Sequence, residues 1–243
     1  MRTIPAMNVR YGSTISLLAG AAALAACGNA EAPVKESSER ISEVPAAAQP
    51  VMGPERRILA FGDSLFAGYN VAADESYPAR LEAALRAQGI NARVANAGVS
   101  GDTTSAGLQR FAFTLDAQPE KPELVIIELG GNDLLRGLPP AQTRDNLDTM
   151  LAETQRRDIP VLLMGMRAPP NLGEGFVAQF DSIYPELAAK YGAQLVPFFL
   201  ESIYRRPELI QPDRVHPTAR GIEELVGATV NSVKTALPQP PAG

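Results

Sequence analysis

The sequence predicts a protein of the α/β class, in which helices cover both faces of a parallel sheet. Short apolar segments alternate along the chain with longer segments whose apolar residues recur at helical spacing. The clearest apolar segment, residues 124–129, is almost entirely aliphatic, as is typical of a buried strand. Residues 55–237 together have the length of one domain. This alternation predicts a three-layer α/β/α sandwich.

The first strand is expected at residues 57–61, where an apolar run ends at Gly62. The other strands are short runs of mainly aliphatic residues. They are expected at residues 93–96, 124–129, 161–164 and 194–197.

The helices are expected between and after these strands. Their predicted ranges are residues 77–88, 143–157, 176–191 and 217–237. Gly89 is a typical stop for the first helix, and Leu147, Met150, Leu151 and Thr154 follow helical spacing in the second. Five strands with intervening helices indicate a flavodoxin-like parallel sheet. We expect the segments after the strands to meet at one edge, where open α/β sheets bind ligands.

The first 26 residues have the pattern of an export signal. Residues 1–14 contain Arg2 and Arg10 and no acidic residue, and residues 15–26 form a run of 12 small and apolar residues. This run is shorter than the ~20 residues that a membrane-spanning helix needs. It fits the apolar core of a signal peptide.

Cys27, the only cysteine, ends the segment Leu24-Ala25-Ala26-Cys27, which resembles a bacterial lipobox. The resemblance implies cleavage before Cys27 and lipidation of its thiol. The alternative is a secreted soluble protein cut near Ala26, which would leave an exposed free thiol. We expect an exported protein, lipid-anchored to the cell envelope. If the host is Gram-negative, Gly28 rather than Asp after the cysteine favours sorting to the outer membrane, with the protein on the periplasmic side.

Two further segments have no periodic apolar face. Residues 27–54 are rich in Ala, Glu, Ser and Pro, and residues 238–243 are rich in Pro. Such segments cannot bury enough apolar surface to fold. We expect a lipidated cysteine followed by a tether, then one folded domain at residues 55–237, and a loose tail.

The charge of the chain argues against a nucleic-acid partner. The formal net charge is −5, and it would be −7 without Arg2 and Arg10. Proteins that bind nucleic acids usually present a basic face. No basic cluster of that kind is expected here.

Ser64 lies just past the first strand, after Gly62 and Asp63. In an open parallel sheet this is the position from which a side chain reaches a bound ligand. The alternative is that Ser64 only caps a helix beginning at Leu65, since Ser and Asp are good N-caps. The sequence at this point leaves both interpretations open.

His216 is the only histidine, and Asp213 stands three residues before it. Histidine is the usual base that takes a proton from a serine nucleophile, and a carboxylate one turn away can orient its ring. One alternative is a surface histidine before a helix that starts at Pro217. Another is half of a metal site, but the folded region has no second His and no Cys. We expect no metal and no cofactor.

Four segments around these residues occur in a characteristic order. They are Gly62-Asp63-Ser64-Leu65, residues 96–103, Gly130-Gly131-Asn132-Asp133, and residues 213–217. In this order they resemble the four blocks of the GDSL, or SGNH, hydrolases, over residues 57–218. The chain is most similar to the bacterial arylesterases, a subfamily of multifunctional thioesterases and lysophospholipases. Residues 128–137 and 178–187 carry this closer similarity.

The resemblance implies a role for each matching residue. Ser64 would be the nucleophile, His216 the general base and Asp213 its partner. The oxyanion hole would consist of the backbone amide of Ser64, Gly101 and Asn132. Gly98 is a rival for Gly101, and residues 130–132 taken alone also fit an ordinary turn. Asp63 and Asp133 are expected to be structural hydrogen-bond acceptors.

Several apolar residues near the predicted edge are candidates for lining an acyl site, or for the core. They are Leu134, Leu135, Leu138, Met166, Pro169, Leu172 and Phe176. Phe66, two residues after the proposed nucleophile, is a candidate for narrowing the pocket.

Three functional classes follow from these observations. The first is a serine hydrolase of carboxylic esters and thioesters, including aryl esters, short to medium acyl esters and lysophospholipids. The second is an O-acetyl esterase acting on envelope glycans with the same residues. The third is a non-catalytic, lipid-anchored binding module, against which the complete set of site residues argues.

Overall fold

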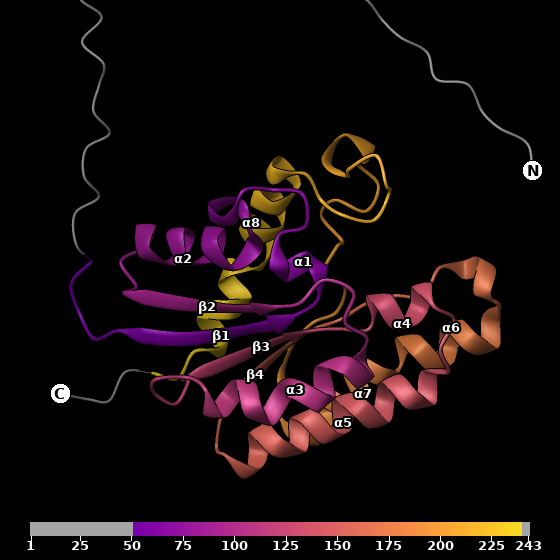
Figure 1. Cartoon of the computed structure of the whole chain (residues 1–243), viewed down its shortest axis with the longest axis horizontal. Coiled ribbons are helices and arrows are strands. Elements are labelled where there is room, and N and C mark those ends of the chain that lie inside the picture. Colours follow the sequence, from indigo (N-terminus) through magenta and orange to yellow (C-terminus); the bar gives the residue numbers. More distant parts are fainter. Residues whose placement is uncertain (1–50, 240–243) are drawn as a thin grey trace, which may run out of the picture. The chain divides into compact units, whose positions relative to one another are not determined.

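The computed structural model describes residues 51–239, which form a five-stranded parallel sheet between two layers of helices (Figure 1). The strand order is β2-β1-β3-β4-β5, and every neighbouring pair is parallel. The strands are β1 Arg56–Gly62, β2 Ala92–Gly98, β3 Leu124–Glu128, β4 Val161–Met164 and β5 Gln194–Val196. This is the flavodoxin strand order. The predicted fold class is confirmed.

The helices divide between the two faces of the sheet, as Figure 1 shows. Helices α2 (Tyr77–Ala87) and α8 (Ala219–Ala236) cover one face, and α3 (Thr104–Asp116), α5 (Pro140–Arg156) and α7 (Ile183–Tyr191) cover the other. Three shorter helices follow strands or loops near the carboxyl edge. They are α1 (Ser64–Ala67), α4 (Gly131–Leu135) and α6 (Glu174–Asp181). Single 3₁₀ turns occur at Ala73–Glu75, Pro170–Leu172 and Pro207–Leu209.

The register of the sheet brings the ends of three strands level with one another. Gly62, the last residue of β1, pairs with Gly98 of β2 and with Glu128 of β3. Because the strands are parallel, the loops that follow them leave from the same edge. The predicted meeting of the first three sequence blocks at this edge is confirmed.

The core lies on both faces of the central strands β1, β3 and β4. Phe61 of β1 packs edge-on against Phe111 of α3. On the opposite layer, the Phe66 ring is fully buried and stacks on Tyr77 with 4.9 Å between ring centroids. Phe66 therefore fills the core, and the suggestion that it narrows a substrate pocket is wrong.

Two helices differ from their predicted ranges, and a proline lies at each point of difference. The expected helix at residues 176–191 is divided into α6 and α7, with Ser182 between them. Pro185 has no N–H to donate to the carbonyl group of Asp181, and its ring crowds that carbonyl group, so the helix is interrupted. Helix α5 begins earlier than predicted, at Pro140, where proline is well tolerated in a first turn.

The last helix begins later in the chain than predicted. Pro217 forms an isolated bridge with Ile210, and α8 begins at Ala219. The Thr218 hydroxyl caps this helix by accepting a hydrogen bond from the N–H of Gly221.

Residues 51–239 include no helix of the length and apolar character needed to cross a membrane. The predicted signal peptide, Cys27 and almost all of the tether lie outside the described residues.

Candidate active site

Ser64 is presented by a tight connection between β1 and α1. β1 ends at Gly62, and the Asp63 carboxylate caps the helix by accepting a hydrogen bond of 3.0 Å from the Leu65 N–H. The helix has only one turn, because Gly68 closes it in a left-handed conformation (φ +83°). The interpretation of Ser64 as the cap is therefore wrong. Asp63 is the cap, which leaves the Ser64 hydroxyl free for another partner.

That partner is the ring of His216. Its Nε2 atom lies 2.8 Å from Ser64 Oγ, and its Nδ1 atom lies 2.7 Å from Asp213 Oδ2. A serine, an imidazole and a carboxylate in this order can transfer a proton away from the serine hydroxyl as it attacks a carbonyl carbon. The structure thus brings together the three residues that the sequence singled out.

The loop that carries His216 is held in place by Gln211. Its backbone N–H donates to His216 O at 2.7 Å, and its side-chain amide donates to Tyr69 O and Pro217 O. The Tyr69 ring lies beside the imidazole, with 4.3 Å between centroids. These contacts join the loop at residues 211–217 to the segment that follows α1.

Asp213 is held in its ionised form by the loop itself. Partial burial acts to raise its pKa, but the backbone N–H groups of Val215 and His216 and the His216 ring donate to its carboxylate. The hydrogen bonds outweigh burial and lower the pKa of Asp213 to about 2. The carboxylate can therefore stabilise a positive imidazolium throughout the neutral pH range.

Two backbone amides near Ser64 have no partner of their own. Among residues 51–239, the N–H groups of Ser64 and Gly101 donate to no acceptor. Gly101 adopts a positive φ of +85°, which favours glycine. The N–H of Gly98, by contrast, already donates to Asn96 Oδ1 at 2.9 Å. The structure therefore favours Gly101 over Gly98 as an available donor.

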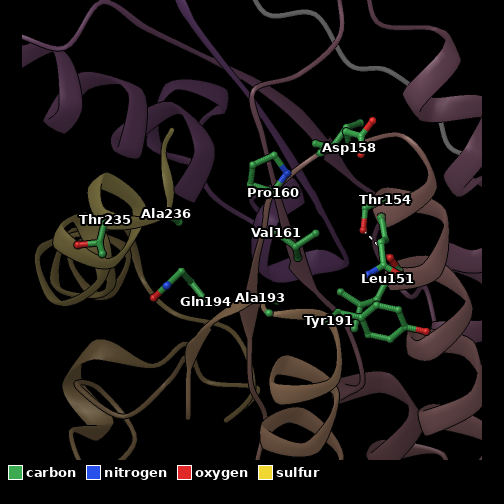
Figure 2. Close-up of a pocket in the computed structure, with 13 residues that line it drawn as sticks. Leu151, Thr154, Asp158, Pro160, Val161, Tyr191, Ala193, Gln194, Thr235 and Ala236 are labelled. Atoms are coloured by element: carbon green, nitrogen blue, oxygen red, sulfur yellow. Dashed lines mark hydrogen bonds between the residues drawn. The ribbon is translucent and has the colours of Figure 1, made fainter. Parts of the chain in front are cut away.

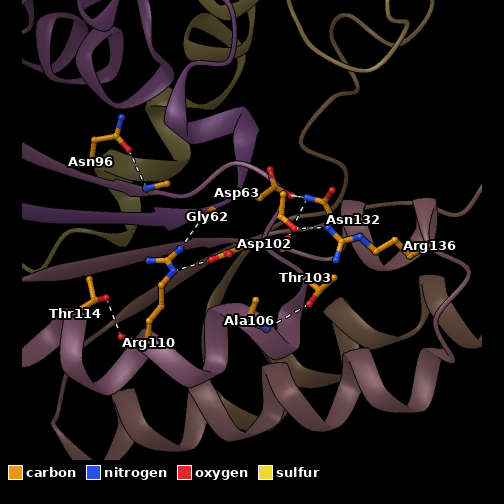
Figure 3. A network of polar contacts seen from close by, with 12 residues as sticks. Gly62, Asp63, Asn96, Asp102, Thr103, Ala106, Arg110, Thr114, Asn132 and Arg136 are labelled. Atoms are coloured by element: carbon orange, nitrogen blue, oxygen red, sulfur yellow. Dashed lines mark hydrogen bonds and ion pairs between the residues drawn. The ribbon is translucent and has the colours of Figure 1, made fainter. Parts of the chain in front are cut away.

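Asn132 lies in the first turn of α4 and links the β1–α1 turn to the loop that follows β2 (Figure 3). Its Nδ2 atom donates to Asp63 Oδ2 at 2.9 Å and to Asp102 O at 3.0 Å. Arg136, the C-cap residue of α4, donates to Gly101 O at 2.7 Å. The residues 130–132 do more than make a turn, since they fasten the Gly101–Asp102 loop beside Ser64.

Arg110 of α3 fixes the same loop from the other side. Its guanidinium donates to Asp102 Oδ2 at 2.6 Å and to Gly62 O at 3.0 Å (Figure 3). It also lies over the Phe61 ring. A planar guanidinium can make two directed contacts and stack at once. Arg110 thereby joins the end of β1 to the loop that follows β2.

Asp133, the neighbour of Asn132, is a structural acceptor, as expected. It is fully buried and accepts hydrogen bonds from Thr104 N, Thr104 Oγ1 and Thr143 Oγ1. These contacts join α4 to the helices α3 and α5.

Sequence reasoning missed the supporting residues Arg110 and Tyr69 and gave Arg136 no role. Arg110 lies 48 residues from the Gly62 carbonyl that it binds, and Arg136 lies 35 residues from its partner. No local pattern marks such contacts. The only available signal was that Arg136 lies close to the Asn132 block.

The candidate acyl-site residues do not form one group. Met166 is buried in the core. The side chains of Leu134, Leu138 and Phe176 are half-buried, and those of Leu135, Pro169 and Leu172 are exposed. Leu134 and Leu135 share α4 with Asn132, so they lie nearest to the site by position in the chain.

A cavity of ≈ 380 Å³ lies at the other end of the sheet (Figure 2). Its lining comes from the beginnings of β4 and β5 and from the ends of α5, α7 and α8. The hydroxyl groups of Thr154 and Thr235 donate to backbone carbonyls of their own helices. No residue of the Ser64 site contributes to this cavity.

Comparisons with known proteins agree with this geometry. The model of the GDSL-like Lipase/Acylhydrolase family matches residues 60–223. An arylesterase of Vibrio mimicus is 42% identical over 161 residues, which are 66% of this chain and 80% of that protein. The esterase TesA of Pseudomonas aeruginosa is 41% identical over 180 residues, which are 74% of this chain and 89% of that protein.

Solved structures include an esterase with much higher identity. AlinE4, described as an SGNH-hydrolase family esterase, is 69% identical, with a TM-score of 0.66, and the match covers 77% of this chain and all (100%) of that one. A structure of TesA is 37% identical, with a TM-score of 0.70 and coverage of 76% and 100%. With most of the described residues matched in sequence and in fold, the chain belongs to the GDSL-like lipase/acylhydrolase family.

Proposed function

We propose that this chain is a serine hydrolase that cleaves carboxylic esters and thioesters through an acyl-enzyme on Ser64. One observation carries the proposal. The Ser64 hydroxyl, the His216 ring and the Asp213 carboxylate form a continuous hydrogen-bonded chain beside the backbone N–H groups of Ser64 and Gly101, which have no acceptor within residues 51–239. That combination supplies both an activated nucleophile and donors for a developing negative charge.

The first half of the reaction makes the acyl-enzyme. Ser64 Oγ attacks the carbonyl carbon while His216 Nε2 accepts its proton, and the carbonyl oxygen becomes an oxyanion. The tetrahedral intermediate then breaks its bond to the leaving oxygen or sulfur atom, which takes the proton back from His216. An alcohol, phenol or thiol departs, and the acyl group stays on Ser64.

The second half returns the enzyme to its initial state. Water attacks the acyl carbon, and His216 takes one of its protons. The intermediate breaks the bond to Ser64 Oγ, which regains that proton from His216 and releases a carboxylic acid. Asp213 stays ionised through both halves and stabilises the imidazolium, consistent with its lowered pKa.

The oxyanion would be received by Ser64 N, Gly101 N and Asn132 Nδ2. In the structure the Asn132 side-chain amide donates to both Asp63 Oδ2 and Asp102 O. Asn132 must therefore turn one hydrogen toward the oxyanion as the charge forms. The bond to a carbonyl oxygen, Asp102 O, is the weaker one to exchange, because Asp63 is a carboxylate.

The relatives support the substrate class. Their names include arylesterase, esterase, and thioesterase 1/protease 1/lysophospholipase L1. We propose that this chain has the corresponding substrates, which are aryl esters, short to medium acyl esters, thioesters and lysophospholipids. The exposed Leu135 on α4 offers apolar surface for an acyl chain close to Asn132.

The test is hydrolysis of p-nitrophenyl acetate, butyrate and decanoate by the full chain and by its Ser64→Ala variant. We expect turnover that disappears in the variant, with a chain-length profile from the three esters. A folded wild type that hydrolyses none of them would contradict the proposal. Acetylated envelope glycans, the substrates of the second functional class, would then be assayed with the same pair of proteins.

We also propose that the enzyme is exported and held on the cell envelope by lipids on Cys27. The lipobox-like segment 24–27 and the apolar run before it support this proposal. Two or more acyl chains are sufficient for stable membrane anchoring. Cys27→Ser should release the protein from the membrane fraction. Unchanged partitioning of this variant would contradict the anchor and leave the esterase proposal untouched.

A further inference from the structure

Glu128, the last residue of β3, carries a carboxyl group that is completely buried. Its exposed fraction is 0%, and within residues 51–239 neither side-chain oxygen receives an N–H or hydroxyl donor. An ionised carboxylate without donors is very costly to bury, so such a group usually keeps its proton. Glu128 therefore requires an acceptor for that proton.

The acceptor is the carboxylate of Asp63, the residue just before Ser64. Asp63 is 2% exposed and already receives two donors, Leu65 N on Oδ1 and Asn132 Nδ2 on Oδ2. The Glu128 carboxyl group lies against Gly62, the residue before Asp63, and is within hydrogen-bonding reach of the Asp63 carboxylate. Two carboxyl groups can share such a bond only when one of them holds a proton.

The surroundings place this proton on Glu128. Burial and then the negative charge of Asp63 raise the pKa of Glu128 well above its ordinary value. Burial also raises the pKa of Asp63, but the hydrogen bonds from Leu65, Glu128 and Asn132 oppose this effect. Asp63 receives two hydrogen bonds from N–H groups, whereas the Asp63 N–H is the only donor near Glu128 within residues 51–239, and it is the smallest of the influences on the pKa of Glu128.

The backbone keeps the two groups together. Gly62 pairs with Glu128 in the sheet, and a Cβ atom on Gly62 would lie 2.8 Å from Glu128 O and 3.0 Å from Glu128 Oε2. Both distances are too short for a side chain, so glycine at position 62 makes room for the Glu128 carboxyl group beneath the β1–α1 turn.

We infer that Glu128 acts as a neutral acid that donates to Asp63 and, through Asp63, holds the amide of Asn132 in place for the oxyanion. This inference rests on the proposed esterase function. It makes Glu128 a positioning residue, since the chain of contacts runs from Glu128 to Asp63 to Asn132 and does not include the substrate. Among the titratable groups around the pair, the charge of His216 acts to lower the pKa of Asp63. Burial, and to a smaller extent the charge of Glu128, raise the pKa values of Tyr77 and Tyr184, so these tyrosines stay neutral.

Two substitutions separate the proton donor from the space that Glu128 fills. Glu128→Gln keeps a donor of nearly the same shape, and Glu128→Met has a similar length but no donor. We expect Glu128→Gln to keep most of the wild-type kcat and Glu128→Met to lose roughly tenfold to a hundredfold in kcat, with a much smaller change in KM. Comparable losses in both folded variants would overturn the inference, as would wild-type kcat in Glu128→Met.

Thr154→Val is the matched control. It removes another fully buried polar group, the hydroxyl that donates to Leu151 O at 2.8 Å, at the opposite end of the sheet from the Asp63–Asn132 contact. Its kcat should stay near the wild-type value even where its thermal stability falls. An equal loss of kcat in this control would attribute the effect of Glu128→Met to general destabilisation.

Infrared spectroscopy tests the proton without relying on kinetics. At neutral pH the wild type should show the carbonyl stretching band of a protonated carboxyl group, and this band should be absent in Glu128→Gln. A wild-type spectrum without the band would overturn the inference. Ser64→Ala assayed in parallel separates the two proposals, because an active Ser64→Ala protein would contradict the esterase mechanism whatever the infrared result.

Discussion

The carboxyl and amino ends of this sheet differ in how their polar groups are used. At the carboxyl end, the Ser64 hydroxyl and the His216 ring bond to each other across 152 positions of the chain. At the amino end there is a cavity of ≈ 380 Å³, but the hydroxyls of Thr154 and Thr235 in its lining bond only within their own helices. A site is marked by polar groups that converge from distant segments, and volume alone does not mark one.

The largest effect should come from the groups that converge at the carboxyl end. Ser64→Ala and His216→Ala should each lower kcat for p-nitrophenyl butyrate by roughly 10⁴ or more, because members of a triad act as one unit. The double variant should be little worse than either single one. A His216→Ala protein that keeps most of its activity would show that another group is the base.

Asp213→Asn should have the next largest effect. The amide can present its NH₂ group to His216 Nδ1, which favours the wrong imidazole tautomer and removes the negative charge. We expect kcat to fall by roughly 10³ to 10⁴, measured with the same ester. A variant within tenfold of the wild type would indicate that the ring is oriented without Asp213.

Asn132→Ala should lower kcat by about 10² to 10³ with little change in KM, as the loss of one oxyanion donor usually does. Asn146→Ala is the matched control, since the Asn146 amide donates to Thr104 Oγ1 and takes no part in the Ser64 site. Equal effects of the two substitutions on kcat would contradict a special role for Asn132.

Glu128→Gln should change how stability depends on pH. Because the pKa of Glu128 is raised in the folded chain, wild-type folding takes up a proton above the unfolded pKa, and its stability falls as pH rises toward the folded pKa. Glutamine has no such loss. Between the unfolded and the folded pKa of Glu128, which means from about pH 5 upward, the free energy of unfolding of Glu128→Gln should rise relative to that of the wild type. The expected rise is about 1.4 kcal/mol per pH unit.

Urea unfolding of Glu128→Gln and the wild type at pH 5, 6, 7 and 8 measures this difference. Glu223→Gln, on the exposed side of α8, controls for the loss of one negative charge. Parallel pH profiles for wild type and Glu128→Gln would mean that Glu128 ionises in the folded chain much as it does when unfolded.

The smallest effect is expected at the amino end of the sheet. Gln155→Ala changes an exposed residue of the cavity lining and should leave ester turnover within about twofold of the wild type, as surface changes away from a site usually do. A tenfold loss of kcat would show that the cavity takes part in the reaction and would remove the contrast between the two ends.

The sequence predicted those parts of the fold that depend on local pattern. The strands β1, β3 and β4 are compact apolar runs, and the solitary histidine left one candidate base. Helix α3 was not predicted, because Gly107 interrupts its pattern. The reason for this glycine is tertiary, since a Cβ atom there would lie 2.6 Å from Leu129 Cδ1.

The supporting residues of the site could not be predicted for the same reason. Arg110 and Glu128 both act through partners on other elements. Arg110 binds Asp102 and Gly62, and Glu128 acts on Asp63. In the sequence Arg110 is an ordinary helix residue and Glu128 is the one polar residue in an aliphatic strand. Only the register of the parallel sheet, which sets Gly62 level with Glu128, reveals what they support.

The most direct test of the central claim is covalent labelling with a monoalkyl phosphonate ester that carries a good leaving group. The wild type should lose its esterase activity as one phosphonyl group adds per chain, and peptide mass spectrometry should locate this group on Ser64. The Ser64→Ala protein should remain unlabelled. A label on another residue, or full labelling of Ser64→Ala, would contradict the assignment of Ser64 as the nucleophile.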